Sequence, residues 1–143
     1  MTSQPASVLG VIEDFQALAV PDRLELLLEF SENLPQLPDR YLEHPDLLER
    51  VEECQAPVYL FVEVPDPSAV HLFFSAPAEA PTTRGFASVL HEALDGLSAQ
   101  EVLNLDPLFP DALGLTAAVS PLRMNGMRGM IARIKRQVRE KTS

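Results

Sequence analysis

Apolar positions recur with helical spacing in the first quarter of the chain. One stripe runs through residues 8 to 19, at Val8, Ile12, Phe15 and Ala19. A second stripe follows at Leu24, Leu27, Leu28 and Leu34. Pro21 fits the first turn of this second helix, where the N–H that proline lacks would have no partner. The pattern predicts two helices, a stiff connector at residues 34 to 38 (LPQLP), and a short helix around Asp46 to Arg50 that begins at Pro45.

The middle of the chain changes to extended runs. VYLFVEV (residues 58 to 64) and AVHLFFS (residues 69 to 75) are rich in β-branched and aromatic side chains. Because the segment PDPS between them is typical of a turn, we expect an antiparallel hairpin. His71 then lies on a strand face, and no cysteine, histidine or carboxylate stands near it at the spacing of metal ligands.

The remaining sequence indicates helices again. We expect a long helix over residues 82 to 95, closed by Gly96, and a short one opened by the capping box SAQE at residues 98 to 101. An irregular connection covers residues 103 to 115, and Ser120 and Pro121 mark the start of the last helix. The buried stripe of that helix is Met127, Met130, Ile131, Ile134 and Val138.

The predicted order is helices, a small antiparallel sheet and helices again, which is an α+β fold. A chain of 143 residues with 46% hydrophobic side chains is typical of one globular domain, so residues 1 to 143 are expected to form a single unit. One cysteine cannot make an internal disulfide, and no apolar run reaches the length of a membrane span. We expect a protein of the reducing cytoplasm that does not bind a membrane.

Charge is distributed unevenly along the chain. The net charge of −10 argues against nucleic acid as a partner, because phosphates need lysine and arginine. Residues 1 to 122 hold twenty acidic and four basic side chains, whereas residues 123 to 143 hold seven basic and one acidic. Such a division favours solubility and the choice of a protein partner, and predicts that docking is sensitive to salt.

Three residues of the last helix do not fit a purely structural account. Gly126 and Gly129 lie in the helix interior, where each costs about 1 kcal/mol relative to alanine, and glycine there suggests close packing of another segment. Arg123 lies in the first turn, where the helix dipole disfavours a cation. We therefore expect it to have a partner, which the sequence leaves open: a carboxylate, a carbonyl-rich loop end or a thiolate.

Cys54 is the only cysteine and lies in the segment RVEECQAPVYL, residues 50 to 60. Pro57 blocks a helix, so Cys54 is predicted to lie in the turn before the first strand. A thiol reacts as the thiolate, and Glu52 and Glu53 would disfavour that form if they lie near the sulfur. Neither a nucleophile turn nor an orienting partner for a Cys–His hydrolase is recognisable, so the residues alone leave a buried structural cysteine and a reactive one both open.

Four segments spread over the chain carry a family resemblance. They are LLEFSENLPQLP (27 to 38), RVEECQAPVYL (50 to 60), RGFASVLHEALDG (84 to 96) and SPLRMNGMRGMIARI (120 to 134). Together they resemble the SufE family, the sulfur acceptors of iron–sulfur cluster assembly. The resemblance implies a SufE/NifU-like fold with a sheet packed against several helices.

The resemblance also implies a function. Cys54 would accept a sulfane sulfur from a SufS-like, PLP-dependent cysteine desulfurase, stimulate that enzyme, and pass the sulfur to a SufB-like scaffold. The chain itself would need no cofactor and have no independent turnover. In a variant of this interpretation, the sulfur comes from a sister desulfurase and goes to another acceptor. Arg123 would draw in the loop or stabilise the anionic sulfur, and the two glycines would allow the loop to approach.

The segment before Gly85 departs from the family pattern. It reads APAEAPTTRG, with Glu79 where an aspartate is usual and without the preceding polar pair. Glu79 and Arg84 are therefore minor candidates for docking, beside Glu52, Glu53 and Gln55 in the cysteine segment. The alternative hypothesis is a non-catalytic interaction domain in which Cys54 is a core residue.

Overall fold

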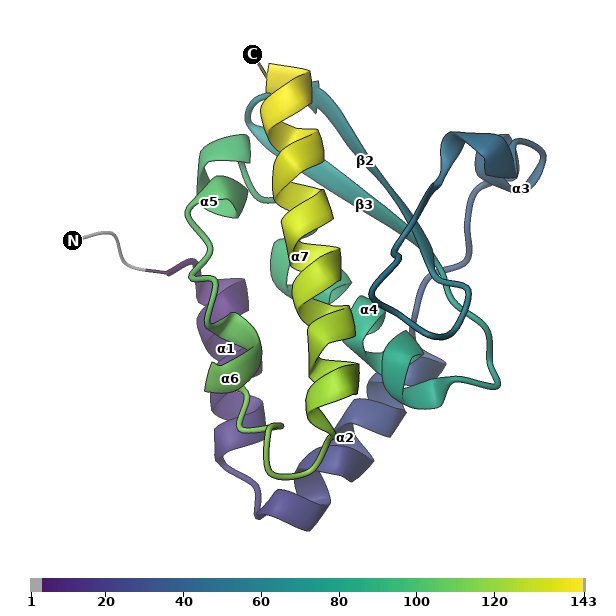
Figure 1. Cartoon of the computed structure of the whole chain (residues 1–143). Coiled ribbons are helices and arrows are strands. Elements are labelled where there is room, and N and C mark those ends of the chain that lie inside the picture. Colours follow the sequence, from purple (N-terminus) through teal and green to yellow (C-terminus); the bar gives the residue numbers. More distant parts are fainter. Residues whose placement is uncertain (1–3, 143) are drawn as a thin grey trace.

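The computed structural model describes residues 4–142 and arranges them as seven α-helices, one 3-10 helix and a three-stranded sheet (Figure 1). The first part of the chain forms α1 (Ala6–Gln16), α2 (Val20–Glu32), α3 (Asp39–Leu42) and η1 (Pro45–Leu47). The strands are β1 (Glu49–Arg50), β2 (Tyr59–Asp66) and β3 (Ala69–Ser75). The remaining helices are α4 (Pro81–Leu94), α5 (Ala99–Leu103), α6 (Phe109–Ala112) and α7 (Pro121–Thr142).

The sheet is antiparallel, in the order β1-β2-β3. Its side chains alternate, because successive residues of a strand point to opposite faces. Leu60 and Val62 of β2 and Leu72 and Phe74 of β3 are buried on the inner face. Phe61 on the outer face instead packs its ring against that of Tyr41 in α3.

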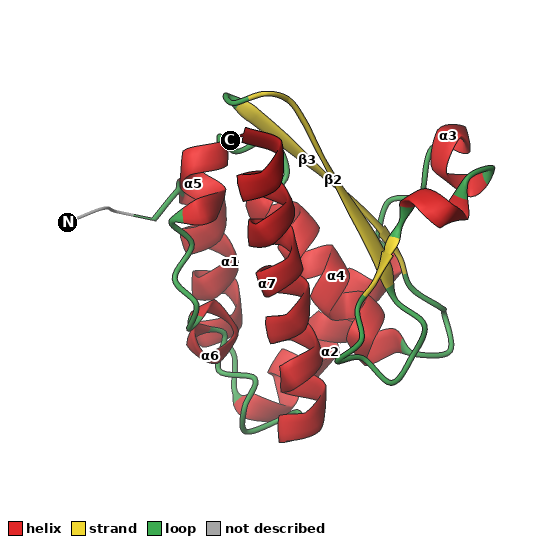
Figure 2. Cartoon of the chain, turned by 45° about the horizontal axis from the view of Figure 1, so that its top comes forward, coloured by secondary structure: helices red, strands yellow, loops and turns green. Residues whose placement is uncertain are grey.

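The long helices cover the inner face of this sheet, as Figure 2 shows, whereas α3 contacts the outer face through the ring of Tyr41. α7 packs on β2 and α4 packs on β3, while α4 is also enclosed by α1, α2 and α7. This central position explains why α4 is buried on most of its circumference, from Thr82 to Leu94. Gly85 lets α2 approach closely, since a Cβ there would lie 2.4 Å from the carbonyl oxygen of Leu27.

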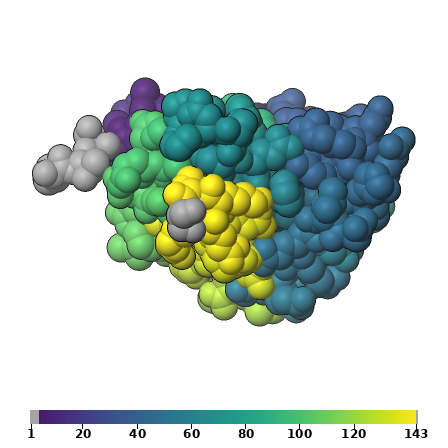
Figure 3. Space-filling model, turned by 90° about the horizontal axis from the view of Figure 1, so that it is seen from above, coloured from purple at the N-terminus to yellow at the C-terminus, as the bar shows by residue number. Residues whose placement is uncertain are grey.

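The last turns of α7 are hydrogen-bonded to the sheet. Gln137 is buried; its Oε1 accepts a hydrogen bond from the Val62 N–H (2.9 Å) and its Nε2 donates to Glu49 (2.9 Å), so it joins β2 and β1. The Lys141 ammonium donates to the Val62 carbonyl and lies 3.7 Å from the centre of the Phe61 ring. Figure 3 shows this end of α7 (yellow) at the surface beside the hairpin (teal).

Most of the predicted elements are confirmed, including the α+β class, the hairpin, and the Ser98–Glu101 capping box with both of its hydrogen bonds. The C-cap of α4 is Asp95, one residue before the predicted Gly96, and Gly96 follows it with φ of 88° in the turn that leaves the helix. In addition, the final helix begins at Pro121, with the Ser120 hydroxyl accepting the Arg123 N–H at 3.3 Å.

Three predictions of secondary structure are wrong. The helix expected around residues 46 to 50 is only the 3-10 turn η1, because Leu48 is extended (ψ 143°) and Glu49 and Arg50 pair with β2. The first helix ends at Gln16, so Ala19 is exposed at the start of α2. Within the connection expected to be irregular, residues 109 to 112 form the short helix α6.

Candidate functional site

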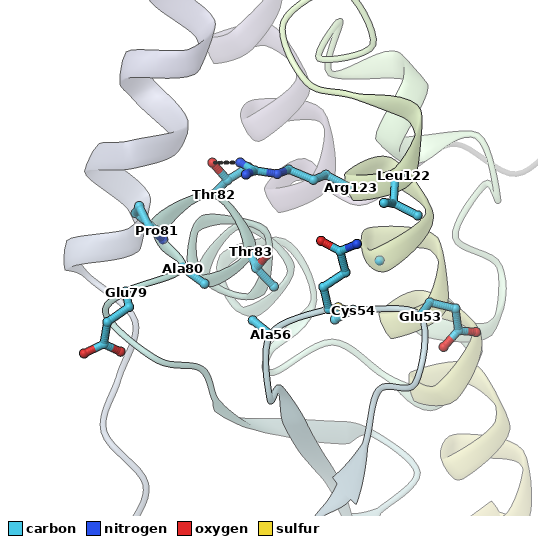
Figure 4. Close-up of a pocket in the computed structure, with 12 residues that line it drawn as sticks. Glu53, Cys54, Ala56, Glu79, Ala80, Pro81, Thr82, Thr83, Leu122 and Arg123 are labelled. Atoms are coloured by element: carbon cyan, nitrogen blue, oxygen red, sulfur yellow. Dashed lines mark hydrogen bonds between the residues drawn. The ribbon is translucent and has the colours of Figure 1, made fainter.

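Three segments that are distant in sequence enclose a cavity of about 340 Å³. They are the cysteine loop between β1 and β2, the segment leading into α4, and the first turns of α7 (Figure 4). The rim is open to solvent, because several of its side chains are exposed: Gln55, Glu79, Pro81, Leu122 and Arg123. The cavity therefore offers a route from the surface to Cys54, which forms part of its wall.

The cysteine loop covers residues 51 to 58 and is closed by backbone hydrogen bonds. The Val51 N–H donates to the Val58 carbonyl (2.9 Å), and the Cys54 N–H donates back to the Val51 carbonyl (3.1 Å). Val51 and Val58 are fully buried and fix both ends of the loop. The loop thus has anchored ends and a short exposed tip, which is the usual setting for a functional side chain.

Cys54 itself is shielded, with only 6% of its surface exposed. Its sulfur lies directly against α7: a Cβ added at Gly126 would be 2.9 Å from Sγ, closer than real side chains approach. Glycine at this position is what allows the sulfur to pack against the helix backbone. In the closed loop, therefore, the cavity adjoins the thiol but does not expose it.

Burial raises the pKa of the Cys54 thiol to about 11, and the negative charge of Glu53 adds to the effect. The positive charges of Arg133 and Arg50 act in the opposite direction but do not compensate. A thiol with this pKa is almost entirely protonated at neutral pH, and only the thiolate is a good nucleophile. The shielded state is consequently an unreactive state.

The N-terminal turns of α4 and α7 both border the cavity. At α4 the preceding residue, Ala80, provides no side-chain cap for the first N–H groups. Arg123 reaches from α7 toward α4, where its Nη1 donates to the Thr82 hydroxyl at 3.2 Å (Figure 4). Two helix N-termini and one guanidinium favour a negative charge in this region, while the carboxylates of Glu53 and Glu79, which also line the cavity, oppose it.

The two glutamates beside Cys54 have different surroundings. Glu52 is exposed, and its carboxylate lies 3.9 Å from Arg50. Glu53 packs over Gly129, where an added Cβ would be 2.6 Å from the glutamate Cδ, and its carboxylate forms an ion pair with Arg133. Gly126 and Gly129 thus provide space for successive residues of the loop, Cys54 and Glu53.

Arg84 lies outside the cavity lining. Its Nε donates to the Ser31 carbonyl (2.8 Å) and its Nη1 to the Ala76 carbonyl (2.6 Å), so it joins the end of α2 to the end of β3. Glu79 and Gln55, in contrast, lie on the cavity rim. The docking roles expected for these three residues stay predictions.

The sequence alone did not point to Arg133, Glu49 or the two threonines of the cavity wall, Thr82 and Thr83. Arg133 contacts a loop that is 80 residues away, and only the fold brings the two together. The one signal was the excess of basic residues in the last helix, which does not single out this arginine. Thr82 follows Pro81 at the start of a helix and reads as an ordinary first-turn residue.

Within residues 4–142, no three His, Cys, Asp or Glu side chains are grouped so that they could hold a metal ion. The same part of the chain has no helix that is both long and apolar enough to cross a bilayer.

Comparison with known proteins identifies the family. Residues 10–138 match SufE, described as the Fe–S metabolism associated domain. The chain is 50% identical to an uncharacterized SufE-like protein of Mycobacterium tuberculosis strain H37Rv over 138 residues, which are 96% of this chain and 95% of that one. A SufE-like protein of Rhizobium meliloti is 31% identical over 130 residues, 87% of this chain and 89% of its own.

A solved structure supports the assignment. The solution structure of a hypothetical protein from Thermus thermophilus superposes with a TM-score of 0.85 at 35% identity, covering 99% of this chain and all of that one. Both sequence and fold therefore lead to the same conclusion: the chain belongs to the SufE family.

Proposed function

We propose that Cys54 accepts a sulfane sulfur from the persulfide of a PLP-dependent cysteine desulfurase and passes it on for iron–sulfur cluster assembly. The family ties the chain to Fe–S metabolism. The observation that carries the proposal is the position of Cys54, on a loop, in the wall of a surface cavity and shielded from solvent. The chain acts as a carrier and as an activator of the desulfurase.

The transfer is an exchange at sulfur. The Cys54 thiolate attacks the outer sulfur of the partner's persulfide, a new S–S bond forms, and the partner's S–S bond breaks. The electron pair of the broken bond stays on the partner's inner sulfur, which leaves as a thiolate, and Cys54 becomes a persulfide. No external oxidant or reductant is needed, and the requirements are access, alignment and a thiolate.

The cavity suits the product of this reaction. Cys54 as a persulfide has one more sulfur atom and is negatively charged, and the adjoining volume of about 340 Å³ accommodates that atom. The N-termini of α4 and α7, together with Arg123, favour an anion there. Arg123 thus acts on the sulfur in the cavity, whereas Arg133 and Arg50 are the cations that affect the resting thiol.

The closed loop protects the Cys54 thiol from oxidation. A protonated, buried thiol resists the oxidation to which exposed thiolates are prone. Docking of the desulfurase, a SufS-like enzyme in this proposal, has to move the loop so that the sulfur meets the persulfide. The exposed apolar Leu122 (53%) lies on the cavity rim, which Gln55 also lines, and supplies a surface for that contact together with the exposed Glu52 of the loop. A SufB-like scaffold receives the sulfur afterwards.

Intact-mass measurement after incubation with L-cysteine and a PLP-dependent desulfurase tests the proposal. We expect the chain to gain the mass of one sulfur atom and to lose it on reduction, and the Cys54→Ser variant to gain nothing while keeping its circular dichroism spectrum. The same variant should not stimulate the desulfurase. An unchanged mass in the wild type with an active desulfurase would instead favour the interaction domain, in which Cys54 is a core residue.

A further inference from the structure

We propose that Glu53 and Arg133 form an ionic latch that holds the cysteine loop against α7 and sets how often Cys54 is exposed. Arg133 is thereby a positioning residue that acts on the thiol through the loop. The inference rests on the proposed function for its purpose, but the geometry that supports it is independent of any partner.

The first observation is how closely the loop tip fits α7. Glu53 packs over Gly129, and its carboxylate pairs with Arg133 one helical turn later. Any side chain at residue 129 would collide with the Glu53 Cδ, Oε1 and Cβ, at 2.6, 2.7 and 3.0 Å from the added Cβ. The glycine, the glutamate and the arginine therefore form one contact, directly beside Cys54 in sequence.

The second observation is that Arg133 has another carboxylate available. Its Nε lies 3.3 Å from Oε2 of Glu49 in β1, although this buried nitrogen makes no hydrogen bond within residues 4–142. Glu49 is held in place by Arg136 and by Gln137, whose Nε2 donates to it at 2.9 Å. Burial alone would raise the pKa of Glu49, but these hydrogen bonds and the neighbouring arginine charges lower it, so the carboxylate is an anion at neutral pH.

These contacts make the latch reversible. When the loop leaves, Glu53, already 41% exposed, becomes hydrated, while Arg133, only 17% exposed, keeps Glu49 as its counter-charge. A lone buried cation would resist opening strongly. Sharing Arg133 between a fixed and a mobile carboxylate removes that obstacle and leaves a weak, salt-sensitive contact to hold the loop.

The rate at which iodoacetamide, an uncharged reagent, alkylates Cys54 tests the latch without any desulfurase. Glu53→Gln and Arg133→Gln should each raise the rate by about two- to fivefold, the range of one partly exposed ion pair. Raising NaCl from low to high concentration should accelerate the wild type by a similar factor and leave both variants nearly unaffected. Arg133→Lys, which keeps the cation, should fall between the wild type and Arg133→Gln.

If Glu53 and Arg133 affected the Cys54 thiol only through their charges, the two variants would behave differently from each other. Removing Glu53 would lower the thiol pKa and accelerate alkylation, but removing Arg133 would raise that pKa and slow it. A slower or unchanged Arg133→Gln variant therefore overturns the latch. Glu52→Gln is the matched control, because it removes a neighbouring charge without touching α7 and should leave the salt response intact.

Gly129→Ala tests the same contact without altering a charge. The added methyl group displaces the Glu53 carboxylate from its position, whereas alanine stabilises the helix interior. We expect faster alkylation with an unchanged or higher melting temperature, which global unfolding cannot produce. Unaltered alkylation in this variant would also overturn the latch, and sulfur uptake from the desulfurase, measured separately, would show whether the proposed function survives.

Discussion

The two halves of α7 pack against their surroundings in different ways. The first half, residues 121 to 133, buries Met124, Met127, Met130 and Ile131 in the core and turns two glycines and an ion pair toward the cysteine loop. The second half, residues 134 to 142, presents fully buried Ile134 and Val138, and Gln137 hydrogen-bonded to both β1 and β2. One continuous helix therefore carries a contact that can open and a contact that cannot.

The difference shows how stability and access are separated in a small domain. Apolar burial is strong, and a buried amide that bonds two strands is costly to leave unpaired. An ion pair that is partly exposed contributes little. Placing the strong contacts at the sheet and the weak ones at the loop allows the loop to move while the fold remains intact, as local opening requires.

Removing buried volume in the second half should have the largest effect. Ile134 is fully buried, so Ile134→Ala should lower the free energy of unfolding by roughly 2–5 kcal/mol, measured by urea denaturation. Alkylation of Cys54 under native conditions should change by less than about twofold, because the loop opens locally. If this variant instead exposes the thiol, the two halves of α7 form one cooperative unit and the distinction between them is wrong.

High pH should reduce stability through the buried thiol. In the unfolded chain Cys54 ionises near its ordinary pKa of about 9.0, whereas in the folded chain its pKa is about 11. As pH rises through this interval the unfolded state releases a proton that the folded state keeps, so the wild type loses stability relative to Cys54→Ala, by at most about 3 kcal/mol. Below pH 8 the difference in unfolding free energy between the wild type and Cys54→Ala should not depend on pH.

Urea denaturation of both proteins at several pH values from neutral to about 11 measures this loss. Local opening of the cysteine loop limits this loss of stability, because the thiolate can form in the open loop while the rest of the domain stays folded. The size of the loss therefore reports the free energy of loop opening. A loss of zero would mean that the loop is open most of the time, in conflict with the closed contact at Gly126.

The fold was predictable wherever the signal is local. The capping box at Ser98, the hairpin and the proline at the start of α7 depend on residues that are adjacent in sequence, and all three are confirmed. β1 was missed because a two-residue edge strand has no alternating pattern, and Glu49 and Arg50 become a strand only by pairing with β2. Short helices such as α6 likewise depend on their packing.

The residues of the site were predictable only where the sequence shows a residue that lowers helix stability. Gly126 and Gly129 stand out because glycine weakens a helix, and the structure shows both beneath the cysteine loop. Arg133 carries no such cost and looks like any other basic residue of an amphipathic helix. Its importance comes from two carboxylates, on β1 and on the loop, that only the tertiary structure brings to it.

Filling the space at Gly126 should have the smallest effect on stability and a clear effect on access. In Gly126→Ala the new Cβ would lie 2.9 Å from the Cys54 sulfur, so either the thiol rotates toward the cavity or the loop moves out. Overpacking costs about 1–3 kcal/mol, while alanine in place of glycine returns about 1 kcal/mol to the helix. We therefore expect the free energy of unfolding to fall by roughly 0–2 kcal/mol, with faster alkylation than in the wild type.

Gly10→Ala is the matched control for this last comparison. Gly10 lies inside α1, and nothing lies within 4 Å of a Cβ placed there, so the variant gains helix stability without new contacts. Its alkylation rate should equal that of the wild type. If Gly126→Ala loses several kcal/mol and labels no faster, the sulfur is held as rigidly as the core beneath the sheet. The first half of α7 would then be a permanent contact like the second, and Cys54 a structural residue.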